Sequence, residues 1–216
     1  MARSHNAVAD GEGLAARPTT EHELSPARLE AVSDGVFAVV LTIMVLELRP
    51  PHETTLPGYL ALWPHAAIYV VSFTTLAACW VNHRYLFSYL RRVSERVLWS
   101  NMALLFFLSL IPFFTASVGE NRLVALTIAM YAAAMLAVGL AFAALALSVR
   151  AQYKSSEMPA AFGARVSLIH AGAQVAHASA IAAAFVHPML ALTVLLVPSV
   201  VYMTKLTRPP SGAIRR

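Results

Sequence analysis

Residues 25–48 read SPARLEAVSDGVFAVVLTIMVLEL, a run long enough to cross a lipid bilayer as one helix although it contains ionisable side chains. Ser25 can accept hydrogen bonds from free amides at a helix start, and Pro26 fits a first helical turn, so the sequence predicts a helix that begins here. An ionisable group inside such a helix costs about 2.5–3.5 kcal/mol, so it usually faces a protein partner or a water-filled path. Those groups are Arg28, Glu30, Asp34 and Glu47.

The composition of the whole chain agrees with a protein embedded in a membrane. Of the 216 residues 58% are hydrophobic and only 12% are charged, and the mean hydropathy is +0.64. The net charge of +5 does not indicate a nucleic-acid partner, because the basic residues lie between apolar runs and form no basic surface patch. Neither a G-x-S-x-G elbow nor a Walker A loop occurs, so we do not expect an enzyme.

Five further apolar stretches follow the first, each near or above the ~20 residues that a membrane span needs. The sequence therefore predicts an all-α integral membrane protein with six transmembrane helices in residues 25–206. Residues 1–24, which lack apolar periodicity, are expected to form a flexible tail, and residues 207–216 a basic tail. The five later helices are expected at residues 58–89, 98–118, 123–149, 164–186 and 188–206.

The basic residues predict the orientation of this six-helix arrangement. With loops assigned alternately to the two sides, one side holds 14 of the 16 lysines and arginines, and the other side holds Arg49 and Arg122. Because basic loops stay in the cytoplasm, both termini and both tails are predicted to be cytoplasmic.

One face of the first helix is apolar apart from a single hydroxyl group. At about 100° per residue, Val39, Ile43 and Leu46 form a stripe with Thr42 beside them, whereas Asp34 points about 140° away from Val39. If this helix lines a pore, the stripe would form a hydrophobic constriction. Packing against other helices or lipid is the alternative, and periodicity by itself favours it.

Other polar residues leave alternatives open. Glu47 could concentrate cations at a pore mouth or pair with Arg49. His170 and His177 share a helix face, but their spacing of seven is wider than that of metal-binding pairs such as H-E-x-x-H, so we expect hydrogen bonding between helices or a hydrated crevice. No fixed metal site is expected.

Two segments carry a resemblance to a known family. Residues 28–34, Arg-Leu-Glu-Ala-Val-Ser-Asp, resemble the Arg-x-x-x-Phe-Ser-Asp signature that opens the first helix of the lysosomal potassium channel family, transmembrane protein 175, in its single-repeat prokaryotic form. Val32 replaces the Phe of that signature. Residues 80–83, Trp-Val-Asn-His, resemble the Trp-x-x-His pattern of the family's second helix.

The resemblance implies a homotetrameric, potassium-preferring cation channel in a bacterial plasma membrane, with four copies of the first helix around the pore. Its partners would be the lipid bilayer and monovalent cations, with no cofactor beyond the permeant potassium ion. The family's pore positions correspond to Val39, Thr42, Ile43 and Leu46. Its inter-helix polar network corresponds to Arg28, Ser33, Asp34, Trp80, Asn82 and His83.

The channel hypothesis differs from an ordinary potassium channel in its filter. No TVGYG sequence occurs, so selectivity would arise from the cost of dehydrating each ion at a ring of branched apolar side chains and four Thr42 hydroxyls. Such a filter should be only modestly selective, and dewetting could gate it.

Two alternatives belong to other classes. A small secondary transporter would use Asp34, Arg28 and His83 as an ion- or proton-coupled site at membrane depth. The absence of inverted repeats in the sequence counts against it. A membrane protein with a purely structural role would use the polar network only for assembly.

Overall fold

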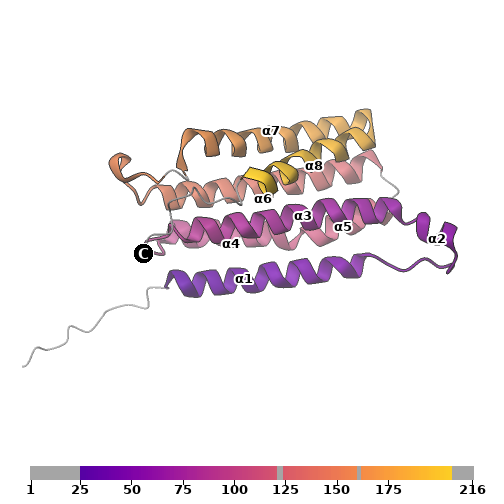
Figure 1. The fold of residues 1–216 in the computed structure, drawn as a ribbon, viewed down its shortest axis with the longest axis horizontal. Coiled ribbons are helices and arrows are strands. Elements are labelled where there is room, and N and C mark those ends of the chain that lie inside the picture. The colour runs from indigo at the N-terminus through magenta and orange to yellow at the C-terminus, as the bar shows by residue number, and fades with distance from the viewer. Residues whose placement is uncertain (1–24, 121–123, 160–161, 206–216) are drawn as a thin grey trace, which may run out of the picture.

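A computed structural model describes residues 25–120, 124–159 and 162–205, and all regular secondary structure in these residues is helical (Figure 1). The predicted tails, residues 1–24 and 207–216, lie outside the described residues. The elements are α1 (Pro26–Ile43), η1 (Met44–Glu47), α2 (Leu56–Leu60), α3 (Trp63–Phe87), α4 (Glu95–Ser109), α5 (Ile111–Glu120), α6 (Ala125–Arg150), η2 (Ser155–Glu157), α7 (Ala164–Val186) and α8 (Pro188–Lys205).

Five segments of the described chain are long and apolar enough to span a membrane, and α8 supplies a shorter apolar helix over Pro188–Val201. Two of these spans combine consecutive helical elements, α1 with η1 and α4 with α5. The five spans are Pro26–Glu47, Trp63–Phe87, Glu95–Glu120, Ala125–Arg150 and Val166–Val186.

The start of α1 confirms the prediction made from its sequence. The Ser25 side chain accepts a hydrogen bond from the Arg28 amide, and Pro26 occupies the first turn. At the other end the helix tightens into the 3₁₀ turn η1 just before Pro50, whose ring cannot continue a helix.

Each of the runs expected at residues 58–89 and 98–118 contains two helical elements, although Trp63–Phe87 and Glu95–Glu120 are each one candidate span. The first is divided into α2 and α3 by a turn at Ala61 and Leu62, just before Pro64. The second is divided at Leu110, because Pro112 lacks an amide that could bond to the Leu108 carbonyl and its ring crowds that group.

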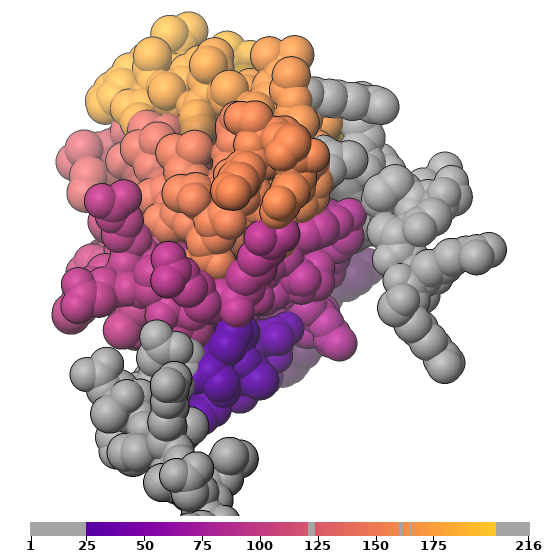
Figure 2. All heavy atoms as spheres, turned by 90° about the vertical axis from the view of Figure 1, so that its left-hand side faces the viewer, coloured from indigo at the N-terminus to yellow at the C-terminus, as the bar shows by residue number. Residues whose placement is uncertain are grey.

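The helices are arranged in layers, with α1 at one edge of the molecule (Figure 1). α1 packs against α3 and α4, while α6 contacts α4 and α5 on one side and α7 on the other. α7 packs on both α6 and α8, and α8 also contacts α3. Viewed along the bundle, α1 forms the rim farthest from α7 and α8 (Figure 2).

Buried hydroxyl groups connect several of these helices. The Ser72 hydroxyl on α3 lies 2.8 Å from both the Thr115 hydroxyl on α5 and the Tyr131 hydroxyl on α6. Thr75 and Ser199 join α3 to α8 through their hydroxyl oxygens, 2.5 Å apart. Such bonds satisfy groups that lipid could not, so they set which helices are neighbours.

The polar face of α7 is turned toward its neighbours. The His170 ring stacks on Phe142 of α6 with centroids 5.5 Å apart. The Gln174 amide packs against Gly139 of α6, where a methyl group would collide with it. His177 is also buried. The shared face predicted for the two histidines therefore belongs to the helix packing, far from α1.

Candidate pore-lining helix and its anchoring network

One face of α1 is buried inside its own subunit. Leu29, Ser33, Phe37 and Val40 recur at the three- and four-residue spacing of a single helix face, Met44 continues this face at the start of η1, and all five are buried. Phe37 also reaches the His83 ring of α3, with centroids 5.4 Å apart. These contacts fix the rotation of α1 against α3 and α4.

The opposite face of α1, continued by η1, carries the four predicted pore residues, of which Leu46 lies in η1, and this face is not covered by the subunit. Val39, Ile43 and Leu46 are 53%, 42% and 72% exposed, and Thr42 is exposed beside them. The Thr42 hydroxyl lies 2.9 Å from the carbonyl oxygens of Ala38 and Val39 and donates its proton to the helix backbone. Its oxygen lone pairs therefore remain free to accept from whatever lies along this face.

A chain of hydrogen bonds holds the buried face. Asn101 of α4 donates from Nδ2 to Ser33 Oγ at 2.9 Å, and Ser33 donates to the Leu29 carbonyl at 2.9 Å. His83 Nε2 lies 2.9 Å from Asn101 Oδ1. Because that amide oxygen can only accept, the His83 ring carries a proton on Nε2, and the bonds run in one direction from α3 through α4 to α1. His83, Asn101 and Ser33 are all fully buried.

A second hydrogen bond fixes the flank of α1. Trp80 donates from Nε1 to Asp34 Oδ1 at 2.8 Å. Both side chains are half-buried. The indole supplies a neutral donor to the carboxylate, so Asp34 faces α3 and not the stripe that contains Val39.

Two of the six predicted network residues do not join these bonds within the subunit. The Asn82 amide donates to the Ala78 carbonyl of its own helix at 2.8 Å. Arg28 is exposed, and among the described residues its guanidinium has no ion pair. Ser33, Asp34, Trp80 and His83 are thus brought together, and Arg28 and Asn82 are not.

Asn101 is the central member of the network, and the sequence analysis did not single it out. It is one amide in the otherwise largely apolar run 98–118, which was the available signal. Nothing in the sequence says which way that amide points, because its partners lie 18 and 68 residues away.

At the far end of α1 the ionic contacts differ from the pair considered in the sequence. Arg49 pairs with Glu120 of α5 at 3.1 Å, rather than with Glu47. Both partners are largely exposed, so the pair contributes little to stability, about 0–1 kcal/mol. It does place opposite charges together where α1 and α5 end.

The spans and the anchored helix define an all-α, multi-pass membrane protein. Residues 28–112 match the family model described as endosomal/lysosomal potassium channel TMEM175. A relative from Chryseobacterium sp. (strain P1-3), named a potassium channel, is 30% identical over 174 residues, which cover 78% of this chain and 88% of the relative. The chain therefore belongs to the TMEM175 family, a family of channels and not of enzymes, as its signature residues predicted.

Two further comparisons agree with this membership. A potassium channel of Streptomyces collinus is 39% identical over 127 residues, which cover 55% of this chain and 61% of that protein. A crystal structure of a lysosomal potassium-selective channel TMEM175 homolog from Chamaesiphon minutus matches with a TM-score of 0.75, at 24% identity, over 85% of this chain and 98% of that one. At this identity the structural likeness concerns the fold.

Proposed function

We propose that this protein is a potassium-preferring cation channel that conducts passively through a pore lined by α1 of four identical subunits. The observation that carries the proposal is the uncovered face of α1, which presents Val39, Thr42, Ile43 and Leu46 away from the subunit. Exposure of apolar side chains does not by itself distinguish a pore from lipid, since both accommodate them. Family membership favours the pore, because the curated relatives are named potassium channels.

The mechanism follows from the chemistry of that face. In a fourfold ring, branched side chains would narrow the pore to a constriction at which an ion must lose part of its hydration shell. The Thr42 oxygens, whose protons are donated to the backbone, are acceptors that could replace part of that shell. Potassium loses water more readily than the smaller sodium ion, so such a ring prefers potassium without a carbonyl filter.

The buried network has a mechanical role in this proposal. A constriction of side chains keeps its width only if each copy of α1 keeps its rotation and depth. Ser33 and Asp34 are bonded to α4 and α3 respectively, so the helix is held on two sides. In the assembled protein, the exposed Arg28 and the buried Asn82 are proposed to complete the network.

The proposal includes the membrane arrangement. The protein spans a bacterial plasma membrane six times, with α8 as the sixth span, and its termini, including residues 1–24 and 207–216, are cytoplasmic. The support is the distribution of basic residues, 14 of 16 on one side.

A coupled transport site has no observation in its favour. It would require Arg28, Asp34 and His83 to act on one ion or proton. Asp34 is instead bonded to the Trp80 indole, and His83 to the Asn101 amide.

Recordings in planar bilayers under a potassium gradient test the proposal. We expect unitary currents that reverse near the potassium equilibrium potential, and a changed potassium-to-sodium permeability ratio in Thr42→Ala and Ile43→Ala. The matched control is Val175→Ala, a branched residue exposed on α7 and remote from α1, which should leave the reversal potential unchanged.

Two results would contradict it. Reversal potentials unchanged in both stripe variants would remove the stripe from the pore. Coupled flux without unitary currents would indicate a transporter.

A further inference from the structure

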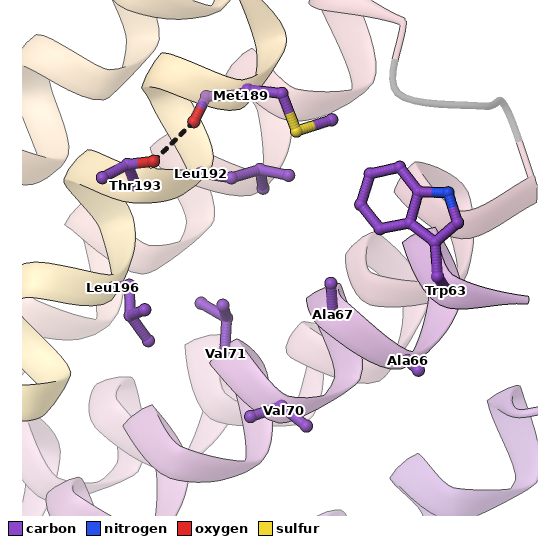
Figure 3. Close-up of a pocket in the computed structure, with 9 residues that line it drawn as sticks. All are labelled: Trp63, Ala66, Ala67, Val70, Val71, Met189, Leu192, Thr193 and Leu196. Carbon is purple, nitrogen blue, oxygen red and sulfur yellow. Dashed lines mark hydrogen bonds between the residues drawn. The ribbon is translucent and has the colours of Figure 1, made fainter.

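A hollow of about 470 Å³ lies between α3 and α8, on the side of the molecule away from α1. This volume falls within the ~300–1,000 Å³ of small-molecule sites. Figure 3 shows Trp63 and Met189 at one end of it and Val71 with Leu196 at the other. The small side chains of Ala66 and Ala67 on α3 leave the space that the larger residues surround.

The deep end of the hollow is closed by a polar contact. One turn beyond Val71 and Leu196, the hydroxyl oxygens of Thr75 and Ser199 lie 2.5 Å apart and hold α3 against α8. Toward the first turns of both helices there is no comparable contact in the described residues, and the hollow opens beside Trp63, which is 55% exposed. The result is a groove closed at one end.

The lining of the groove is almost wholly apolar. Its single hydroxyl, that of Thr193, donates to the Met189 carbonyl of its own helix at 2.8 Å (Figure 3). An occupant is therefore not required to supply a hydrogen-bond partner, and a polar ligand would lose its own. This excludes ions and sugars and favours a hydrocarbon.

The position and length of the groove indicate which kind of hydrocarbon it can hold. It lies along the span Trp63–Phe87, so its surroundings are lipid and not water. From Trp63 to Val71 the lining extends about 12 Å along α3, close to the ~15 Å depth of one hydrocarbon leaflet. Trp63 lies at the mouth, and tryptophan favours the level of the lipid head groups.

We propose that this groove binds one acyl chain of a membrane phospholipid, inserted alongside α3 from the leaflet in which α3 begins, with its head group beside Trp63. The chain runs parallel to the helices and ends near Val71 and Leu196. This binding site does not involve α1, so it is independent of the proposed pore.

A photoreactive lipid tests the proposal on the full-length protein in vesicles. The probe is phosphatidylcholine with a diazirine on one acyl chain, and cross-linked positions are mapped by mass spectrometry. We expect adducts concentrated on the α8 segment from Met189 to Leu196 and on the first turns of α3. Phospholipid retained by the detergent-solubilised protein is counted independently by native mass spectrometry.

The variant Ala67→Phe places a ring in the groove. It should lower photolabelling of the groove several-fold and should also lower the number of phospholipids that the solubilised protein retains. The control Ala133→Phe adds the same ring to an exposed position of α6 and should change neither. Equal elution profiles and melting temperatures of the two variants show that folding is intact.

Three outcomes would overturn the inference. Adducts spread evenly over the exposed helix faces of the unaltered protein would mean bulk lipid contact only, whatever the variants do. Groove labelling unchanged in a folded Ala67→Phe protein would exclude the site. Cross-linking of a photoreactive amino acid placed at position 196 to a second protein chain would assign the groove to a neighbouring subunit.

Discussion

At the scale of single residues, Asn101 determines more of the site than any residue of the family signature. Its amide uses its oxygen for His83 and its nitrogen for Ser33, and all three side chains are shielded from water and lipid. A buried amide with both ends engaged stabilises one arrangement of three helices, since removing it leaves His83 Nε2 unpaired and takes from Ser33 Oγ its bond to α4.

The first prediction concerns this amide. Asn101→Ala should lower the melting temperature of the detergent-solubilised protein, because His83 Nε2 is left unpaired at a cost of about 1–3 kcal/mol and Ser33 Oγ loses the bond it accepts, keeping only its bond to the Leu29 carbonyl. Thr127→Ala is the control: it removes a side-chain hydroxyl that bonds only to the carbonyl of Val124, just before its own helix. Thermal unfolding followed by intrinsic fluorescence compares the two. Equal losses would mean that the inter-helix bonds carry no special weight.

At the scale of helices, close contacts between neighbouring elements explain where small residues occur. Gly119, near the end of α5, faces His65 near the start of α3, and a methyl group there would lie 2.5 Å from the ring carbon Cδ2. The His65 ring would therefore have to rotate away, or the two helices would have to separate. Gly172 on α7 has nothing within 4 Å of that position.

The second prediction follows from this difference. Gly119→Ala should lower the thermal stability, while Gly172→Ala should leave it unchanged or raise it by up to about 1 kcal/mol, because alanine favours a helix over glycine. Thermal melts of both variants in one detergent measure the effect. A Gly119→Ala protein as stable as the unaltered chain would show that α3 and α5 are not held at this distance.

Side-chain contacts also join two of the connections between helices. Gln152, just after α6, accepts from the Arg91 and Arg92 amides at 3.2 and 3.3 Å and donates to the Arg92 carbonyl at 2.9 Å. Arg91 pairs with Glu157 at 3.1 Å and lies over the Tyr153 ring, 4.2 Å from its centroid. The α3–α4 connection is thereby joined to the one that follows α6.

The third prediction compares the hydrogen bonds of Gln152 with the ion pair between Arg91 and Glu157. Gln152→Ala should increase amide hydrogen exchange across residues 88–94, because three hydrogen bonds between the Gln152 side chain and the backbone of Arg91 and Arg92 are lost, at about 0.5–1.5 kcal/mol each. Glu157→Ala should have a smaller effect, since an exposed ion pair contributes about 0–1 kcal/mol. Hydrogen exchange measured by mass spectrometry compares the two variants. A larger increase in Glu157→Ala than in Gln152→Ala would mean that the ion pair, and not the hydrogen bonds, holds the two connections together.

At the scale of the whole molecule, the main question is what covers the free face of α1. Gly35 lies on that face, and within the subunit nothing lies within 4 Å of an added methyl group. The subunit itself therefore leaves space for a larger side chain at Gly35. A fourfold assembly would bring four such faces together around one axis.

The fourth prediction is that Gly35→Leu weakens the tetramer whereas Gly172→Leu, at the open position on α7, does not. Native mass spectrometry in mild detergent should give four copies of the 23.3 kDa chain for the unaltered protein and smaller species for Gly35→Leu. Monomers or dimers from the unaltered protein would contradict the assembly. A stable Gly35→Leu tetramer would place this face away from the subunit contacts.

The sequence by itself determined five apolar spans and a shorter apolar helix at α8, the start of α1 at Ser25 and Pro26, and membership of the family. These follow from local properties: hydropathy over about 20 residues, capping chemistry and a short signature. The stripe of Val39, Thr42, Ile43 and Leu46 was also found by periodicity, because side chains on one helix face recur at fixed spacing.

Only the tertiary structure decided which groups meet. The pairing of Asn101 with Ser33 and His83, of Asp34 with Trp80 and of Arg49 with Glu120 joins residues 18 to 71 positions apart in the chain. No local pattern encodes such partners, since each depends on the rotation of two or three helices at once. The same reason applies to the free face of α1 and to the groove between α3 and α8: a sequence shows that a side chain is apolar, and only packing decides whether another side chain covers it.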